Sequence, residues 1–260
     1  MNLIKEKYGP WALITGASAG IGAEFARQLS EEGLNLILVA RRKDRLDELA
    51  AELKEMNHVE VKTLPVDLAR PDFMSSIRPA VQSLEVGLLV NNAGFGMTGP
   101  FLQSNLEREL EMLDVNCRAP LILTHELGKE MVKRKRGGII IVSSTSSFLA
   151  TPYMTHYAAT KAFDLSLGEG LWYELKEHGV DVMALCPGGT STEFHQLSGI
   201  RGVMCMPVEP VVTQALKSLG KKPLHISGWQ NRVKVFLVQL NLRWINTSVA
   251  GKIVRKLQSQ

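Results

Sequence analysis

Short apolar runs alternate with longer amphipathic segments along most of this 260-residue chain. The runs are rich in Val, Ile and Leu and lie near residues 11–14, 34–40, 59–64, 86–92, 137–144, 181–187 and 224–227. Such runs are typical of strands that are buried on both faces, and the segments between them have helical periodicity. The pattern predicts an α/β fold: a single doubly wound, Rossmann-type domain with a parallel sheet covered by helices on both faces.

A glycine-rich turn follows the first run and leads into an amphipathic helix. Gly16, Gly20 and Gly22 lie in this turn, and glycine lets the backbone bend tightly and approach a ligand. The free N–H groups and the dipole at a helix start favour a pyrophosphate. The spacing G-x-x-x-G-x-G differs from the usual G-x-G-x-x-G, and a plain loop is the alternative. The flanking strand and helix favour nucleotide binding.

The second run ends in Ala40, Arg41 and Arg42, without a carboxylate. In a doubly wound sheet the residue at this point faces the adenosine ribose, where an acid binds the 2'-hydroxyl and an arginine suits a 2'-phosphate. A solvated basic turn is the alternative reading. Together with the glycine turn, the arginines favour NADP(H) over NAD(H).

Tyr157 and Lys161 stand four residues apart, with Ser144 thirteen positions before the tyrosine. Residues at i and i+4 share one face of a helix, so the ammonium is expected beside the phenol. A free tyrosine has a pKa of about 10, and a neighbouring cation favours the phenolate. We therefore expect Lys161 to lower the pKa of Tyr157, although such pairs also occur on ordinary solvated helices.

Taken together, these residues resemble the short-chain dehydrogenase/reductase family, and the stretches ARR and PYMTHYAATKAF look like its NADP-dependent, carbonyl reductase-like branch. The resemblance covers the chain from about Trp11 to Gly228. The matching pieces, in the family's order, are TGASAGIG from Thr15 to Gly22, Asp67-Leu68, NNAG from Asn91 to Gly94, Asn116, Ser144, Tyr157, Lys161, Pro187-Gly188 and Thr190. Each piece is weak alone, but the joint match is specific.

The resemblance implies catalytic roles for four residues: Ser144 holds the substrate oxygen, Tyr157 is the general acid in reduction, Lys161 binds the nicotinamide ribose, and Asn116 holds a water that links Lys161 to solvent. It also implies a homodimer or homotetramer that pairs through segments 116–136 and 157–177. The implied NADP(H)-binding residues are Gly16, Ser18, Gly20, Ile21, Gly22, Arg41, Arg42, Asp67, Leu68, Asn92, Ala93, Gly94, Tyr157, Lys161, Pro187, Gly188 and Thr190.

The segments just after these motifs are mostly apolar, which suggests a lipophilic substrate. Besides Ser144, we expect Phe95, Phe148 and Met154 to contact it, and an ordinary core is the equal alternative. Further candidates are Met97, Leu149, Tyr153 and the loop 190–206, in which Met204 and Met206 could adapt to varied shapes.

Composition excludes several classes of protein. No apolar stretch reaches the twenty residues of a spanning helix, and the start MNLIKEKYGP has no secretion signal. Cys117, Cys186 and Cys205 lack metal-ligand spacing, so we expect no metal and reduced thiols in the cytoplasm. The basic cluster at Lys129 and 133–136 ends a predicted helix, and we expect no nucleic-acid partner.

The end of the chain differs from the rest, because residues 221–260 contain eight Lys or Arg and no acidic residue. We divide the chain into a Rossmann-fold domain, 1–228, and a basic, apolar-rich extension, 229–260. The extension has three possible roles: packing on the domain or at a subunit interface, peripheral contact with an anionic membrane, or binding the phosphates of a coenzyme A thioester.

The residues favour an NADPH-dependent oxidoreductase that transfers hydride between nicotinamide and a carbonyl or secondary alcohol of a lipophilic small molecule. One alternative is a 3-oxoacyl thioester reductase. Another, of a different class, is a non-catalytic NADPH-binding sensor or scaffold, which the intact set of four catalytic residues argues against.

Overall fold

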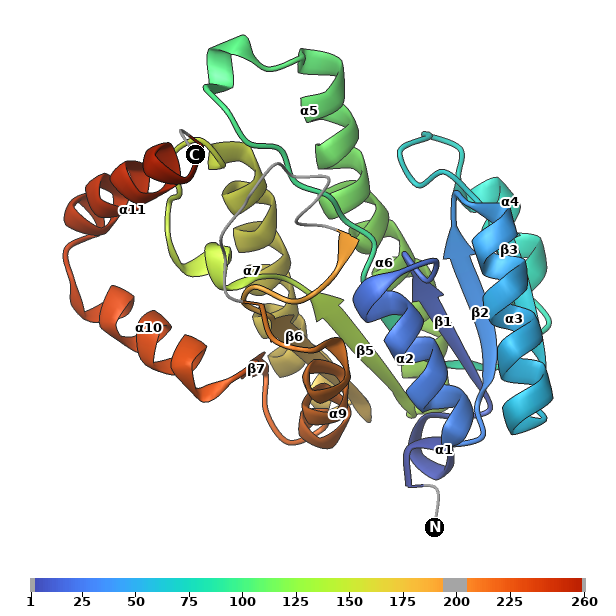
Figure 1. The fold of residues 1–260 in the computed structure, drawn as a ribbon. Coiled ribbons are helices and arrows are strands. Elements are labelled where there is room, and N and C mark those ends of the chain that lie inside the picture. Colours follow the sequence, from blue (N-terminus) through green and yellow to red (C-terminus); the bar gives the residue numbers. More distant parts are fainter. Residues whose placement is uncertain (1–2, 194–204, 259–260) are drawn as a thin grey trace.

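The computed structural model describes residues 3–193 and 205–258. Within that part of the chain, seven parallel strands form one sheet in the order β3-β2-β1-β4-β5-β6-β7 (Figure 1). Each predicted run contains a strand, which confirms the Rossmann-type fold. The strands are β1 (Trp11–Thr15), β2 (Asn35–Ala40), β3 (Val61–Pro65), β4 (Val86–Asn91), β5 (Gly137–Val142), β6 (Val180–Cys186) and β7 (Leu224–Ile226).

Helices cover both faces of the sheet (Figure 1). One face packs against α2 (Gly20–Glu31), α3 (Lys43–Asn57) and α9 (Val208–Ser218). The other packs against α4 (Met74–Val81), α6 (Ala119–Arg134) and α7 (Thr155–Lys176). Alternate strand residues enter the two cores: Ile14 faces α2, whereas Leu13 faces α6, and neither is exposed to solvent.

Several shorter elements join or flank this frame. They are α1 (Leu3–Tyr8), η1 (Phe101–Gln103), α5 (Leu106–Leu113), η2 (Asp114–Arg118) and η3 (Thr145–Phe148). The segment η2 is a π-helical turn between α5 and α6. Such a turn inserts an extra residue into a helix and is frequent at functional sites. Here it contains Asn116, which is buried.

The C-terminal extension consists of α10 (Trp229–Leu240) and α11 (Arg243–Gln258). The helix α10 packs against η3, and a Cβ added to Gly251 of α11 would lie 3.2 Å from Pro152 Cγ. Both helices therefore lie against the segment that follows β5. The boundary between residues 228 and 229 stays a prediction.

The order of the strands places the site. The chain runs outward from β1 to β3 in one direction and from β4 to β7 in the other, so the direction changes between β1 and β4. Ligands of doubly wound folds bind at the carboxyl ends of the strands beside this switch. The residues after β1, β4, β5 and β6 meet at that edge.

Candidate active site

The turn after β1 has the geometry of a pyrophosphate cradle. Gly16 and Gly20 have φ angles of +66° and +56°, which side chains rarely adopt. A Cβ added to Gly22 would lie 2.3 Å from the Gly16 carbonyl oxygen, so the turn closes only around a glycine. The N-cap residue of α2, Ala19, makes no side-chain cap, which leaves the N–H groups of the first turn to donate hydrogen bonds to an anion.

The turn after β4 supports this cradle. The Thr15 hydroxyl accepts hydrogen bonds from the backbone N–H groups of Asn92 (2.9 Å) and Ala93 (3.0 Å). The Asn92 side chain donates to the Thr15 carbonyl at 2.9 Å and to the Gly16 carbonyl at 3.3 Å. These bonds join the two strand ends on either side of the topological switch, where Asn92 and Ala93 are predicted to bind NADP(H).

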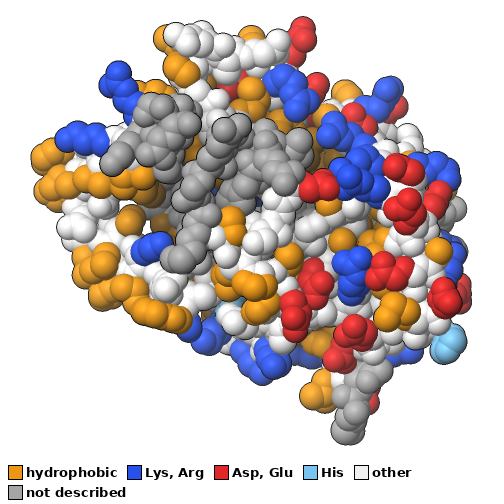
Figure 2. All heavy atoms as spheres, viewed as in Figure 1, with side chains coloured by type: hydrophobic (Ala, Val, Ile, Leu, Met, Phe, Trp, Pro, Cys, Tyr) orange, Lys and Arg blue, Asp and Glu red, His pale blue; other side chains and the backbone are white. Residues whose placement is uncertain are grey.

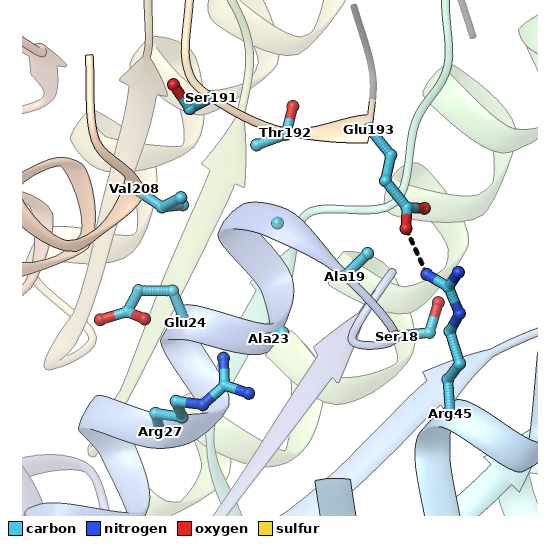
Figure 3. A pocket seen from close by; sticks show the side chains of 11 residues that line it. Ser18, Ala19, Ala23, Glu24, Arg27, Arg45, Ser191, Thr192, Glu193 and Val208 are labelled. Atoms are coloured by element: carbon cyan, nitrogen blue, oxygen red, sulfur yellow. Dashed lines mark hydrogen bonds and ion pairs between the residues drawn. The ribbon is translucent and has the colours of Figure 1, made fainter. Parts of the chain in front are cut away.

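Two arginines gather beside the cradle. Arg42 donates to the Ser18 hydroxyl from Nη2 at 3.1 Å and pairs with the Glu193 carboxylate at 2.8 Å. Arg45, on the first turn of α3, pairs with the same carboxylate (Figure 3). Both pairs hold the pKa of Glu193 below its usual range, with the Arg45 hydrogen bond as the larger cause. Arg41 is exposed.

A cavity of about 570 Å³ opens over the start of α2, between these groups and the segment that follows β6. Figure 3 shows Ser18, Ala19 and Ala23 on one side and Ser191, Thr192 and Val208 on the other. Its charged lining consists of Arg27, Arg45, Glu24 and Glu193. Arg45 is thus a cation of the cavity wall, and Glu193 links it to Arg42, where the sequence predicts a 2'-phosphate.

The other predicted cofactor residues lie along the same edge. Asp67 and the buried Leu68 follow β3, and Asp67 Oδ1 accepts a hydrogen bond from the Ala69 N–H at 3.1 Å. After β6, Thr190 is buried and donates to the Gly188 carbonyl at 3.1 Å. Pro187 is buried, and Ile21 lies in the first turn of α2.

Three residues predicted to be catalytic lie together: Ser144 follows β5 and is the N-cap of η3, and Tyr157 and Lys161 are on α7. Tyr157 is 7% exposed, and its phenol is hydrogen-bonded to the Ser144 side chain. Lys161 is one turn further along α7 and is 5% exposed. Its ammonium donates to the Val142 carbonyl at the end of β5 (2.9 Å) and to Asp164 Oδ2 (2.9 Å). The structure thus brings the phenol, the hydroxyl and the ammonium to the carboxyl edge of the sheet.

Asn116 reaches the same place through the π-helical turn. Its side-chain amide donates to the Phe95 carbonyl and to the Thr160 hydroxyl, both at 3.0 Å, and accepts from the Phe95 N–H at 3.1 Å. A Cβ added to Gly94 would lie 3.2 Å from Asn116 Oδ1 and 3.3 Å from Lys161 Nζ. The amide therefore fixes the chain after β4 beside the Lys161 ammonium.

Burial changes the electrostatic expectation for Tyr157. Lys161 acts to lower the pKa of the phenol, as the sequence predicts, and Ser144 acts in the same direction, but burial outweighs both and the pKa of Tyr157 is raised. Burial also acts to lower the pKa of Lys161, and the nearby Asp164 and Tyr157 more than offset it. The expected net lowering of the tyrosine pKa is wrong for this structure, because the phenol is desolvated and Asp164 balances the lysine charge.

The predicted substrate-facing residues fall into two groups. Phe95 and Met154 pack with Tyr157 and Met112 in one apolar cluster. Phe148, the last residue of η3, packs instead in a second cluster with Leu165, Ala184 and Cys186. Met97 and Tyr153 line a small hollow with Tyr157, whereas Leu149 is half-buried after η3. Residues 194–204 of the predicted loop, Met204 among them, lie outside the described residues, and Met206 pairs with Thr190.

Sequence reasoning missed several charged residues of the site. Asp164 and Lys161 are three residues apart, a helical spacing that was available as a signal. Glu109 and His156 form a close pair, 2.6 Å from Nδ1 to Oε2, beside the hollow. Arg45 and Glu193 are 148 residues apart, and no local pattern relates them.

The described residues contain no group of three or more His, Cys, Asp or Glu side chains that could hold a metal ion. Across the same described ranges, no helix is long and apolar enough to cross a membrane.

Comparison with known proteins relates residues 10–199 to the family described as short chain dehydrogenase. A 7beta-hydroxysteroid dehydrogenase of Clostridium sardiniense is 34% identical over 235 residues, which cover 89% of this chain and 90% of that protein. A very-long-chain 3-oxoacyl-CoA reductase of Homo sapiens is 33% identical and covers 82% of this chain and 69% of its own length.

Solved structures agree in fold over nearly the whole chain. A 7beta-hydroxysteroid dehydrogenase structure superposes with a TM-score of 0.89 at 29% identity, covering 95% of this chain and 98% of that one. A short-chain dehydrogenase from Sphingobium yanoikuyae in complex with NADPH gives 0.82 at 33% identity, with 89% and 92% covered. A bulky-bulky ketone specific alcohol dehydrogenase from Comamonas testosteroni gives 0.78 at 31%, with 90% and 93% covered.

Proposed function

The chain belongs to the short-chain dehydrogenase family, and we propose that it reduces the carbonyl group of a bulky, lipophilic small molecule. It is an enzyme, an oxidoreductase that uses NADP(H) and transfers hydride between nicotinamide and a carbonyl or secondary alcohol. The bulky substrate class is supported by the apolar cluster of Phe95, Met112, Met154 and Tyr157, and by the relatives that act on hydroxysteroids and bulky ketones.

The residues of the site supply the protein's part of this chemistry. NADPH, when bound, supplies the hydride. The Ser144 hydroxyl and the Tyr157 phenol are placed to donate hydrogen bonds to the carbonyl oxygen and stabilise the negative charge that develops on it. Tyr157 then gives its proton to that oxygen, and Lys161 orients the ribose of the cofactor. Asn116 holds the chain after β4 beside Lys161.

The observation that carries the proposal is the placement of the buried Tyr157 one turn before the buried Lys161 on α7, with Ser144 beside the phenol, at the edge where the glycine cradle lies. NADPH consumption by the purified protein should be measured over a panel of steroid ketones, other bulky ketones and 3-oxoacyl thioesters. We expect turnover with bulky ketones. Tight NADPH binding without turnover of any member of the panel would favour a non-catalytic sensor instead.

A second candidate is the reduction of 3-oxoacyl thioesters. It is supported by the 33% identical 3-oxoacyl-CoA reductase and by exposed cations of the extension, among them Arg232 and Lys234, which suit coenzyme A phosphates. The same panel separates the two, because higher kcat/KM for a coenzyme A thioester than for the matching free ketone would favour this candidate.

We propose further that Ser18, Arg42 and Arg45 receive the 2'-phosphate of NADP(H), which takes the place of the Glu193 carboxylate between the two guanidinium groups. Guanidinium forks suit a phosphate as well as a carboxylate. Replacing both arginines by alanine should raise the KM for NADPH about a hundredfold, roughly the effect of two lost charge-assisted bonds, and leave the KM for NADH within about twofold.

The control for this experiment is Lys43→Ala, which removes a neighbouring cation that pairs with Asp47 and is exposed. It should leave both KM values unchanged. Glu193→Gln should tighten NADPH binding several-fold, because the competing carboxylate is then neutral. Equal losses for NADPH and NADH in the double arginine variant would contradict the 2'-phosphate assignment.

The extension carries a further proposal: α10 and α11 contact an anionic membrane surface from the cytoplasm. Figure 2 shows hydrophobic side chains gathered on the side of the molecule where these helices lie, with Lys and Arg beside them. The exposed apolar residues are Trp229, Val233, Phe236, Leu237, Leu240, Leu242, Trp244, Ile245, Val249 and Ile253. Each basic group near an anionic lipid surface contributes about 1 kcal/mol.

Sedimentation with vesicles of anionic or neutral lipid tests this surface. We expect binding to the anionic vesicles only, and its loss in Phe236→Gln/Trp244→Gln, while Met56→Gln on α3 serves as the exposed apolar control.

Light scattering should in parallel show a homodimer or homotetramer, which we expect to form through α6 and α7. If the wild-type protein binds no vesicles and Phe236→Gln/Trp244→Gln changes the mass of the assembly, a second copy of the chain covers this surface instead.

A further inference from the structure

The C-terminal extension reaches the segment that is predicted to bind the nicotinamide half of the cofactor. This segment, residues 187–190, follows β6, and α10 begins after β7 (Figure 1). A Cβ added to Gly188 would lie 2.3 Å from Asn231 Nδ2, and 2.7 Å from both Cγ and Oδ1 of the same side chain. The amide of Asn231, on the first turn of α10, therefore fills the space directly beside Gly188.

The backbone of Gly188 does not by itself explain the glycine. Gly16 and Gly20 have positive φ angles, whereas Gly188 is not among the positive-φ glycines of the described part of the chain. A side chain at position 188 would therefore meet no left-handed backbone strain. The Asn231 amide stands in its way instead, so the glycine at this position is matched to a residue of the extension.

Hydrogen bonds also tie the amide to the end of β6. Asn231 Nδ2 donates to the Ser227 carbonyl at 2.8 Å, and the Ser227 N–H donates to the Cys186 carbonyl at 3.2 Å. Ser227 and Cys186 are both 0% exposed, so water does not compete for the bond between them. Because Cys186 directly precedes residue 187, the amide is fixed relative to the strand end from which the segment 187–190 leaves.

The bond to Ser227 does not cap α10. The N-cap residue, Gly228, has no side-chain cap, and the free groups at a helix start are N–H donors that need an acceptor. Asn231 Nδ2 is itself a donor, so its bond to Ser227 leaves those groups unchanged. Val235, one turn further along α10, is buried and packs the same face of the helix on the domain. The bond therefore orients the amide beside Gly188 rather than completing the helix.

Main-chain hydrogen bonds hold the two neighbours of Gly188. The Thr145 N–H donates to the Pro187 carbonyl at 2.9 Å, and the Met206 N–H donates to the Gly189 carbonyl at 2.9 Å. The α10 amide packs on Gly188 between them. The same helix also packs against η3, so it contacts both segments that follow the central strands β5 and β6.

We propose that Asn231 is a positioning residue for the nicotinamide half of NADP(H), and that α10 is thereby part of the cofactor site. Its amide holds the segment 187–190 from the side of the extension and acts through Gly188, without touching the reacting atoms. The inference rests on the proposed function, because it concerns the segment that is predicted to orient the nicotinamide. A displaced segment would weaken cofactor binding and also disturb the geometry of hydride transfer.

Binding measurements on the full-length protein test the inference without any substrate. Asn231→Ala should raise the Kd for NADPH about tenfold, roughly the effect of one lost hydrogen bond. The Kd for adenosine 2',5'-bisphosphate, which carries the 2'-phosphate but no nicotinamide, should stay within about twofold. In ketone reduction, kcat should fall by about tenfold, whereas the KM for the ketone should change little. Equal weakening of both ligands, or unchanged NADPH binding, overturns the proposal.

Asn241→Ala is the matched control. Asn241 Nδ2 donates to the Leu237 carbonyl at 2.8 Å, so it makes the same kind of bond at the exposed end of α10. Its loss should leave both Kd values and kcat within about twofold of the wild-type values. Asn231→Asp is a second variant of the site, because the carboxylate keeps the shape of the amide but has no donor for the Ser227 carbonyl. It should show the same selective loss of NADPH binding.

A double-mutant cycle tests the contact between Asn231 and Gly188. Gly188→Ala should raise the Kd for NADPH about tenfold, because the added methyl group displaces the amide. In the Asn231→Ala protein the methyl group has room, so Gly188→Ala should there change the Kd by at most about twofold. Independent effects that multiply to about a hundredfold in the double variant overturn the proposal.

These results separate the inference from the function on which it rests. If the wild-type protein binds NADPH but reduces no ketone or thioester, the proposed function fails, and the binding comparison still decides the role of Asn231. If the wild-type protein reduces ketones and Asn231→Ala matches it in both Kd values and in kcat, the inference alone fails. Thermal unfolding of each variant checks that the compared proteins are folded.

Discussion

The molecule contains two clusters of one tyrosine, one lysine and one aspartate, at opposite ends of its sheet. At the carboxyl edge, Lys161 is bonded to Asp164, and the Tyr157 phenol is bonded to Ser144. At the other edge, the aspartate is the residue that contacts both of the others. The Asp181 carboxylate accepts a hydrogen bond from Tyr8 at 2.7 Å and pairs with Lys7 at 2.6 Å.

The difference lies in which group is in the middle. Asp181 stands between its two partners and holds the Tyr8 proton directly, and Lys7 is more than half exposed. Lys161 is the group that links Asp164 to the phenol, and both charges are buried. The same three residue types thus give a fixed structural bond at one edge and, at the other, the tyrosine that we propose as proton donor.

The largest expected effect separates the two phenols. Tyr157→Phe should lower kcat for ketone reduction about a thousandfold, because the proton donor is lost, and leave NADPH binding nearly intact. Tyr8→Phe should leave kcat within about twofold and cost about 1 kcal/mol of unfolding free energy. Steady-state kinetics and urea denaturation measure both. Comparable losses of kcat in the two variants would contradict the proposed difference in role between Tyr157 and Tyr8.

The two lysines should differ by a smaller factor. Lys161→Met removes the cation that orients the cofactor and stabilises developing charge, and should lower kcat/KM about a hundredfold. Lys7→Met removes an exposed ion pair and should change stability by at most about 0.5 kcal/mol, without a kinetic effect. Kinetics with NADPH and thermal unfolding of the same preparations provide the comparison.

The smallest effect is a pH dependence of stability. Burial, then the hydrogen bond and charge of Asp181, raise the pKa of Tyr8 above its ordinary value. A raised pKa contributes stability that is fully present below the unfolded value of about 10 and is lost as the pH rises beyond it. The unfolding free energy of the wild-type protein should therefore fall above pH of about 10, by up to about 1.4 kcal/mol per unit from this group.

Tyr8→Phe should show a shallower fall over the same range, and Tyr173→Phe, on an exposed tyrosine, should follow the wild-type protein. Urea midpoints measured at a series of alkaline pH values give both slopes. Parallel slopes for the wild-type protein and Tyr8→Phe would show that the Tyr8 bond carries no pH dependence.

Local patterns in the chain were enough to predict the frame of the site. Apolar runs give the strands, helical spacing gives α2 and α7, and the glycine turn follows β1 as expected. Tyr157 and Lys161 lie one turn apart on α7, so their proximity also follows from spacing. Spacing did not predict the net effect of burial on the pKa of the Tyr157 phenol. Desolvation depends on everything packed around α7, and sequence distance to Lys161 does not measure it.

The amino-acid sequence by itself determined the order of strands and helices, the glycine turn after β1 and the choice of the residues that we propose for proton transfer, because these depend on patterns within short segments. Only the tertiary structure decided that Glu193 lies between Arg42 and Arg45, that Phe148 and Tyr157 belong to different apolar clusters, and that Asp164 is buried beside Lys161. Such pairings depend on how distant segments pack, and packing fixes both their distances and the dielectric in which their charges interact.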